Sequence, residues 1–199
     1  MVKTVEEAKR RELYEVIKEV LGDDYIYLKF TKINIEECYE SEGSSRIRGD
    51  LQETQASVVT VASLDSYGCG VLDAVFNGIL DHYLEDYPSL GNVSFVGFGV
   101  SPNFSTKKAS GADAEVEVTM QLSNSSNSIM TFRNTGKSFV RASVFGLTQA
   151  MEFYINSEKA FRQLRFLIED ASKRNRGDVK QAYVSKISKI VKVTSYENI

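Results

Sequence analysis

The chain is poor in the residues from which catalytic and metal sites are often built. It has one histidine, His82, and two cysteines, Cys38 and Cys69, among 199 residues. A metal site of several imidazoles therefore cannot be built within one chain, although a site made only of carboxylates stays open. The cysteines have no metal-binding or redox spacing and fit a reducing compartment. His82 has Asp81 and Glu85 as neighbours and no evident partner for general-base catalysis.

Long runs of one charge and long apolar runs are also missing. The formal net charge is −3, and the densest basic stretch, Lys173–Arg176, is short enough to be a solvated helix end. Nucleic acid is therefore not expected as the main partner. Residues 1–22 are charged throughout and lack the apolar core of a signal peptide, and no run reaches membrane-spanning length. We expect a cytoplasmic protein with no membrane partner.

Five segments have apolar residues at helical spacing. The first ends at Gly22, which fits a C-terminal cap. The third carries a buried stripe from Val140 to Tyr154, and the last is mixed in character. The five expected helical segments are 4–21, 70–86, 140–154, 158–172 and 178–192.

Strand patterns alternate with these helices. Residues 112–122 have the cleanest two-residue period, with alanine, valine, methionine and leucine on one face and polar residues on the other. Residues 56–62 are apolar on both sides and predict a well-buried strand, whereas 40–46 predict a loop. In residues 25–36 the apolar phase slips before Ile33, which indicates either a bulge or a twist in a long strand. The remaining expected strands are 93–100 and 129–133.

The order of these elements predicts a repeated unit of strands, a glycine turn and a helix, about 70 residues per copy. Helices packed on antiparallel sheet, an α+β fold, follow from this order. The first glycine turn, Gly68–Ala74, opens the helix at 70–86, and the second is Asn134–Ser138. Backbone N–H groups at such a helix start can bind an anion. The alternative interpretation is that Gly68 and Gly70 only make a tight turn between strand and helix.

At these positions the chain resembles a known family, the regulatory domain of 2-isopropylmalate synthase and citramalate synthase, also called the LeuA allosteric or dimerisation domain. Gly68–Ala74 looks like its G-N-G-P-V-D-A motif, and Asp86–Leu90 occupies the turn that follows the helix. Gly111–Val118 is similar to its G-x-D-A-x-V-x-V strand. Arg141–Tyr154 is similar to its E-A-S-x-x-A-L-x-x-x-x-E-Y helix. The resemblance covers roughly residues 25–156.

The resemblance implies two pseudo-symmetric βββα units in residues 25–156, with a helical extension at 1–24 and another at 157–199. Domains of this family form homodimers and bind leucine or isoleucine. Here Asp73 could face the ligand's ammonium or cap its own helix, and the alanines could either leave room for an aliphatic side chain or pack helix on sheet. The residues implied to bind the ligand are Gly68, Gly70, Leu72, Asp73, Ala74, Ala112, Ala114, Gly136 and Ser138.

The chain departs from the family at Val71, Leu72, Ser138 and Arg141, where the family has proline, valine, an aspartate or asparagine, and glutamate. A dimerisation or scaffold module that has lost its ligand is therefore the alternative function. The family's catalytic (β/α)₈ barrel, which needs about 250 residues, has no counterpart here. We therefore expect no enzymatic activity and no cofactor or metal.

A separate synthase chain is a further expected partner, because the resemblance implies regulation of a catalyst that this sequence does not contain. Met1 and the helix that follows it favour a standalone chain. An enzyme that acts through a lone carboxylate is the remaining alternative, although no spacing pairs an acid with a base. The carboxylates considered for that role are Asp65, Asp73 and Asp113.

Overall fold

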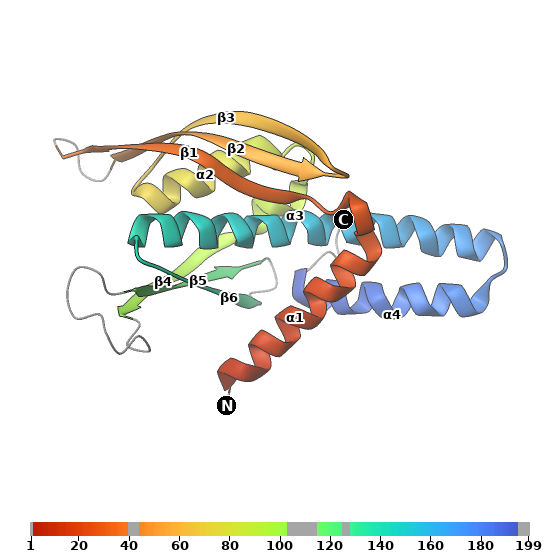
Figure 1. The fold of residues 1–199 in the computed structure, drawn as a ribbon. Coiled ribbons are helices and arrows are strands. Elements are labelled where there is room, and N and C mark those ends of the chain that lie inside the picture. The colour runs from red at the N-terminus through yellow and green to blue at the C-terminus, as the bar shows by residue number, and fades with distance from the viewer. Residues whose placement is uncertain (1, 40–43, 103–114, 125–127, 195–199) are drawn as a thin grey trace.

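The computed structural model describes residues 2–39, 44–102, 115–124 and 128–194. In these residues, two three-stranded sheets lie on either side of the first half of a long helix, whose second half projects beyond the sheets and packs against the last helix of the chain (Figure 1). The elements are α1 (Val2–Leu21), β1 (Tyr27–Cys38), β2 (Ser44–Gln55), β3 (Val58–Gly68), α2 (Val71–Tyr83), β4 (Ser94–Pro102), β5 (Val116–Ser123), β6 (Ile129–Gly136), α3 (Phe139–Lys173) and α4 (Gly177–Thr194). Short 3₁₀ helices, Gly22–Asp24 and Pro88–Asn92, follow α1 and α2.

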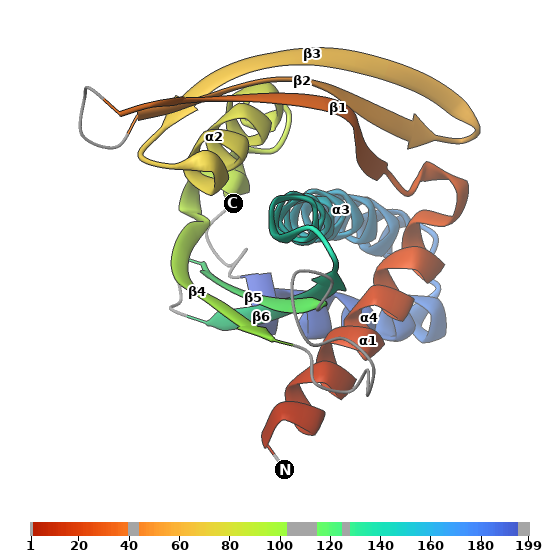
Figure 2. The ribbon, with the colours of Figure 1, turned by 60° about the vertical axis from the view of Figure 1, so that its left-hand side comes forward.

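The chain folds as two successive βββα units. Strands β1–β2–β3 form one antiparallel meander that leads into α2, and β4–β5–β6 form a second that leads into α3. Figure 2 shows α3 between the two sheets, with α2 beneath the first sheet and α1 crossing beside α3. The predicted α+β class is confirmed, as are the helical extensions at both ends. Among the described residues, no helix combines the length and apolar character needed to cross a membrane.

One strand, β2, was missed by the sequence analysis, which took 40–46 as a loop and began a strand at residue 56. The strand spans Ser44–Gln55 and turns into β3 through Ala56 and Ser57. These two residues have φ values of 47° and 66°, the left-handed geometry of a two-residue hairpin turn that usually carries Asn-Gly. Neither residue of the turn is glycine or asparagine, so no local signal marks the end of one strand and the start of the next.

The predicted burial of residues 56–62 is wrong. Val58, Val59 and Val61 are 63%, 56% and 59% exposed. These residues lie at the start of β3, an edge strand. Helix α2 meets the other end of β3, where Ser66 Oγ donates to the Ala74 carbonyl at 2.6 Å. An apolar run was therefore mistaken for a buried one because its position in the sheet is not encoded locally.

The two helices expected at 140–154 and 158–172 are one continuous helix, α3, of 35 residues. The polar residues Asn156, Ser157 and Glu158 interrupt the apolar pattern, yet all three are fully buried. Each has a hydrogen-bond partner that accounts for its burial. The predicted domain division between residues 156 and 157 thus falls inside a helix, and it stays a prediction.

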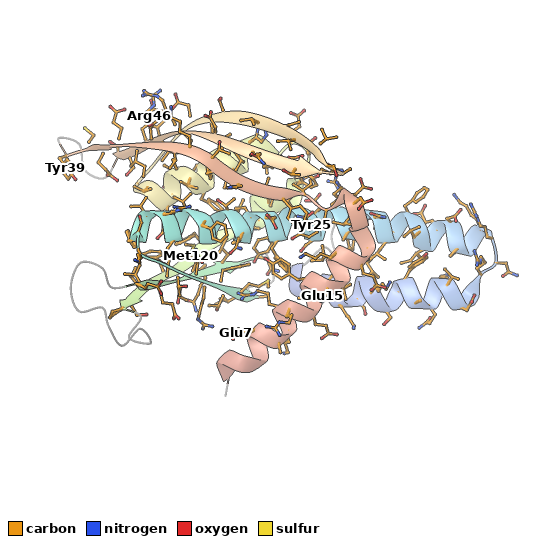
Figure 3. The ribbon with its side chains drawn as sticks, in the orientation of Figure 1. Glu7, Glu15, Tyr25, Tyr39, Arg46 and Met120 are labelled. Atoms are coloured by element: carbon orange, nitrogen blue, oxygen red, sulfur yellow. The ribbon has the colours of Figure 1, made fainter. Side chains whose placement is uncertain are left out.

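Buried hydrogen bonds join the second unit's helix to the first unit's sheet. The Asn156 amide accepts from Ile26 N at 2.8 Å and donates to the Ile26 carbonyl at 2.7 Å. One turn earlier, Glu152 accepts from Leu28 N at 2.9 Å and from Tyr25 Oη at 3.0 Å; Tyr25 lies between α1 and α3 (Figure 3). The side chains of α3 therefore replace a neighbouring strand along the beginning of β1.

Candidate functional site

An open groove of about 700 Å³ lies between β1 and the first turns of α3. Helix α1 packs on α3 farther along, where the Tyr14 and Phe153 rings are 5.0 Å apart. The groove therefore joins a strand of the first unit to the helix of the second. Its lining residues are Lys29, Phe30, Thr31, Lys32, Ile33, Ile35, Ser138, Val140, Arg141, Val144, Phe145 and Thr148.

The β1 side of the groove is shaped by a bulge. The pairing of β1 with β2 shifts between Phe30 and Lys32, which leaves Thr31 as the extra residue. After the shift, Ile33 and Ile35 are half-buried on the face that packs toward the core. The predicted bulge is confirmed, and the slip of apolar phase was the sequence signal for this wall of the groove.

The α3 side begins at the helix N-terminus. Ser138 is the N-cap, and its Oγ accepts a hydrogen bond from Arg141 N at 3.3 Å. The positive end of the helix dipole therefore lies at one end of the groove. Val144 and Phe145 continue the lining along the next turn, and about half of the Phe145 side chain is exposed.

The charged residues of the described lining have one sign. Among the twelve lining residues in the part of the chain that the structure describes, Lys29, Lys32 and Arg141 are basic and none is acidic. The register of β1 with β2 and β3 puts Lys29 and Lys32 on the same face as Val61 and Ser63, the outer face of the first sheet, so their backbone and not their charge borders the groove. Arg141, next to the N-terminus of α3, is therefore the lining residue placed to attract an anion. The volume falls in the range of about 300–1,000 Å³ that is typical of small-molecule sites. The groove suits a small carboxylate that also carries an apolar group.

The first unit's corner is closed by its own side chains. A Cβ at Gly68 would lie 2.3 Å from Ala74 N, so the strand end and the start of α2 are in direct contact. Asp73 Oδ2 accepts a hydrogen bond from Cys69 N at 2.8 Å. Of its two expected roles, Asp73 therefore takes the capping one. Gly70 is extended, and a Cβ there would meet no atom within 4 Å.

The predicted site residues divide between the two corners. Helices α2 and α3 begin at the same end of the molecule (Figures 1 and 2). Of the predicted residues that the structure describes, only Ser138 lines the groove. Gly68, Gly70, Leu72, Asp73 and Ala74 belong to the closed corner, where Ala74 is fully buried.

Of the remaining predicted residues, Gly136 is the one in the part of the chain that the structure describes, and it does not line the groove. Gly136 precedes the α3 cap, with its nearest side-chain neighbour at Ala142. Ala112 and Ala114 lie outside the described residues. The groove residues that the prediction missed are six on β1, which belongs to the other unit of the repeat, and five on α3.

Two buried carboxylates outside the groove have structural partners. Burial raises the pKa of Glu152 above its ordinary value, and its hydrogen bonds from Leu28 N and Tyr25 Oη act in the opposite direction. Glu158 accepts from Ser89 N at 3.1 Å and Ser89 Oγ at 2.6 Å, and it pairs with Arg162. Both hold α3 to neighbouring segments. Within the described part of the chain, no group of three His, Cys, Asp or Glu side chains is placed to hold a metal ion.

The outer face of the first sheet carries an exposed ion-pair cluster. Arg46 projects from this face, away from α3 (Figure 3). It donates to Asp65 Oδ1 at 2.7 Å and lies over the Tyr67 ring at 4.9 Å. The paired guanidinium lowers the pKa of Asp65. Because Asp65 is already paired with arginine, it is poorly suited to the role of a free catalytic base.

Comparison with known proteins gives this geometry no family: no family model matches the chain, and no curated protein matches it either.

Proposed function

We propose that this protein is a noncatalytic regulatory domain that binds a small branched-chain acid in the groove between β1 and α3. The observation that carries the proposal is the groove itself, with apolar lining residues from β1 and α3 and with Arg141 in the first turn of α3. The ligand class is leucine, isoleucine or a related metabolite, as the motif resemblance to the 2-isopropylmalate and citramalate synthase domain suggests.

The two ends of such a ligand match different parts of the groove. Its carboxylate would lie near Ser138 and Arg141, where the helix dipole and the guanidinium both favour an anion. Its branched aliphatic group would pack on Ile33, Val144 and Phe145. An ammonium group would find hydroxyl oxygens but no carboxylate in the lining, so the corresponding 2-oxo acids belong in the same test as the amino acids.

Regulation would follow from differential binding. The protein would act as a cytoplasmic homodimer, and the ligand would stabilise one arrangement of that dimer or of its complex with a separate synthase chain. The groove lies between the two units, so a ligand there would fix the first unit's sheet relative to the second unit's helix. A change in the position of the first unit's sheet relative to α3 would then alter the surface that a partner binds.

Isothermal titration calorimetry tests the proposal with leucine, isoleucine and their 2-oxo acids. The wild-type protein should bind at least one of them, and Arg141→Gln should weaken that binding about 10- to 100-fold, the value of one charge-assisted contact. Arg11→Gln is the matched control, because Arg11 is an exposed helical arginine on α1 that does not line the groove. Folded protein that binds none of the four compounds would refute the proposal.

A dimerisation or scaffold module without a ligand is the second candidate. The exposed valines at the start of β3 favour it, since they suit an interface and have no role in the groove. A stable dimer whose association constant is unchanged by all four compounds would support this candidate over the first.

A further inference from the structure

The two sheets have four edge strands, β1, β3, β4 and β6. An edge strand leaves backbone N–H and C=O groups free to pair with another chain, and proteins usually guard such edges with charges, proline, bulges or a covering element. The four edges of this protein differ sharply in how they are guarded.

Two edges are guarded by side chains from helices. Strand β1 has the bulge at Thr31, and Asn156 binds the backbone of Ile26, the residue that precedes the strand. Strand β6 is covered by α1, since Arg10 donates to the Thr131 carbonyl and Glu7 pairs with Arg133. Neither strand offers a free and regular edge along its length.

Strand β4 is guarded by its own sequence. Its pairing with β5 shifts between Phe95 and Gly97, and the strand ends at Pro102, which has no N–H to donate. Both features interrupt the regular row of hydrogen-bonding groups that a partner strand would need.

Among the described residues, the first seven positions of strand β3 have none of these devices. Its register with β2 runs without a shift from Val58 to Gly68, and the first seven residues, Val-Val-Thr-Val-Ala-Ser-Leu, contain no charge, proline or glycine. Within the part of the chain that the structure describes, β2 is its only neighbouring strand. Figures 1 and 2 show β3 as the border of the first sheet, with α2 beneath it.

We propose that the unguarded edge formed by residues 58–64 pairs antiparallel with the same edge of a second copy, which makes one six-stranded sheet across a twofold axis. This inference rests on the homodimer of the proposed function and names the surface that forms it. The pairing would place Val59 and Val61 of both copies side by side on the outer face of the joined sheet.

A second copy is the occupant that the charge pattern favours. Around a twofold axis each residue faces itself or a near neighbour, so a charged edge would bring like charges together. Residues 58–64 have no such conflict. The nearest charge along the strand, Asp65, is already paired with Arg46 and Arg48. Two copies of this strand can therefore pair without bringing like charges together.

Sedimentation equilibrium over a concentration series provides the first test. The double variant Val59→Lys/Val61→Lys puts two like charges per copy on the pairing edge, and it should convert a dimeric protein to a monomer, with at least a 100-fold weaker association. Val96→Lys is the matched control, because Val96 is 50% exposed on β4 and should leave the dimer intact. Circular dichroism should show the same secondary structure in all three proteins.

The outcomes separate this inference from the proposals on which it rests. A wild-type protein that stays monomeric would overturn both the homodimer and the paired edge, whatever the calorimetry shows. A dimer that survives the double substitution would overturn the paired edge alone and place the dimer interface elsewhere. Failure of ligand binding with a dimer that the double variant dissociates would overturn only the ligand.

Disulfide scanning gives a second test that does not depend on the lysine variants folding. A twofold axis perpendicular to the sheet must pass beside one residue that opposes its own copy, because opposed residues share a face. Cα atoms in such pairs are about 4.5–5.5 Å apart, within disulfide range.

Single cysteines at positions 59 to 63, with Cys38→Ser and Cys69→Ser, should give one dominant disulfide-linked dimer under mild oxidation. A cysteine at position 96 should not link. Equal and slow linking at every position would overturn the paired edge.

Discussion

The two βββα units share an order of elements but not the state of their helix starts. In the first unit, Gly68 contacts the first turn of α2, and Asp73 caps that helix by accepting from Cys69 N. In the second, the start of α3 at Ser138 opens on a groove. A glycine turn followed by a helix therefore does not make a binding site by itself. The second corner gains its groove from β1, a strand of the other unit.

The helices of the two units, α2 and α3, also differ in what they pack against. Helix α2 packs on its own sheet, at β2 and β3, whereas α3 contacts both sheets and also α1, α2 and α4. Asn156 and Glu152 make the hydrogen bonds that α3 needs to hold a strand of the other unit. The first unit therefore depends on the second for its β1 edge, while α2 can be perturbed with smaller consequences.

The largest effect is expected from breaking the joint between the units. Asn156→Ala would leave the buried Ile26 N–H and carbonyl without partners, and we expect a loss of about 2–5 kcal/mol in the free energy of unfolding. Urea denaturation followed by circular dichroism measures this loss.

Asn77→Ala is its control in the first unit. Asn77 lies on α2 and donates to the Tyr67 carbonyl at 2.9 Å in an exposed setting, so water can replace the bond and about 0.5–1 kcal/mol should be lost. If both variants lost the same stability, the claimed dependence of β1 on α3 would be wrong.

The second prediction compares the two corners directly. Gly68→Ala would place a Cβ 2.3 Å from Ala74 N, and since this neighbour is helix backbone, α2 must move. We expect a loss of about 1–3 kcal/mol. Gly136→Ala would meet Ala142 Cβ at 3.4 Å, an ordinary contact, and should change stability by about 0.5 kcal/mol or less. Thermal unfolding of both variants gives the comparison, and equal losses would mean that the two corners are equally closed.

The elements that could be predicted from the sequence are those with a regular spacing of apolar residues. The alternation of β5 and the apolar stripe of α3 are strong patterns, and both were found. Strand β2 was missed because its turn, Ala56 and Ser57, has no turn-forming residue. The exposure of β3 could not be read from its sequence, because an edge strand and a central strand can carry the same valines.

The groove shows the same limit at the level of the site. Ser138 was predicted because the second glycine turn corresponds to a ligand-binding corner in the family that the chain resembles. Arg141 was noticed as a departure from the family motif, but its neighbours on β1 were not, since nothing in the sequence pairs residues 29–35 with residues 138–148. That pairing depends on Asn156 and Glu152, which are buried polar residues whose partners are backbone atoms far away in the chain.

The third prediction uses the raised pKa of Glu152 to probe the joint by pH. Because burial raises this pKa in the folded protein above its ordinary 4.5, the protonated form stabilises the fold. That stability is present in full below about pH 4.5 and is lost as the pH rises through the raised folded pKa. Glu152→Gln should flatten this part of the stability profile, since glutamine can still accept from Leu28 N and donate to Tyr25 Oη.

Chemical denaturation at several pH values between 4 and 8 measures that slope. Glu12→Gln is the control on α1: Lys189 lowers the pKa of Glu12, so its contribution has the opposite sign and is lost as the pH falls. Identical profiles for the wild-type protein and Glu152→Gln would mean that this carboxylate titrates alike in the folded and unfolded states.

The smallest effect is expected at the β2–β3 hairpin. This hairpin is longer than the corresponding one in the second unit: β2 and β3 have 12 and 11 residues, whereas β5 and β6 have 8 each. Ser57 holds a φ of 66° at the β2–β3 turn, so Ser57→Gly should raise the free energy of unfolding by about 0.5–1 kcal/mol. Ser101→Gly, in β4 and outside the left-handed region, should lower it by a similar amount. Opposite signs in thermal unfolding would show that the long hairpin forms despite its turn, held by the cross-strand pairs between β2 and β3.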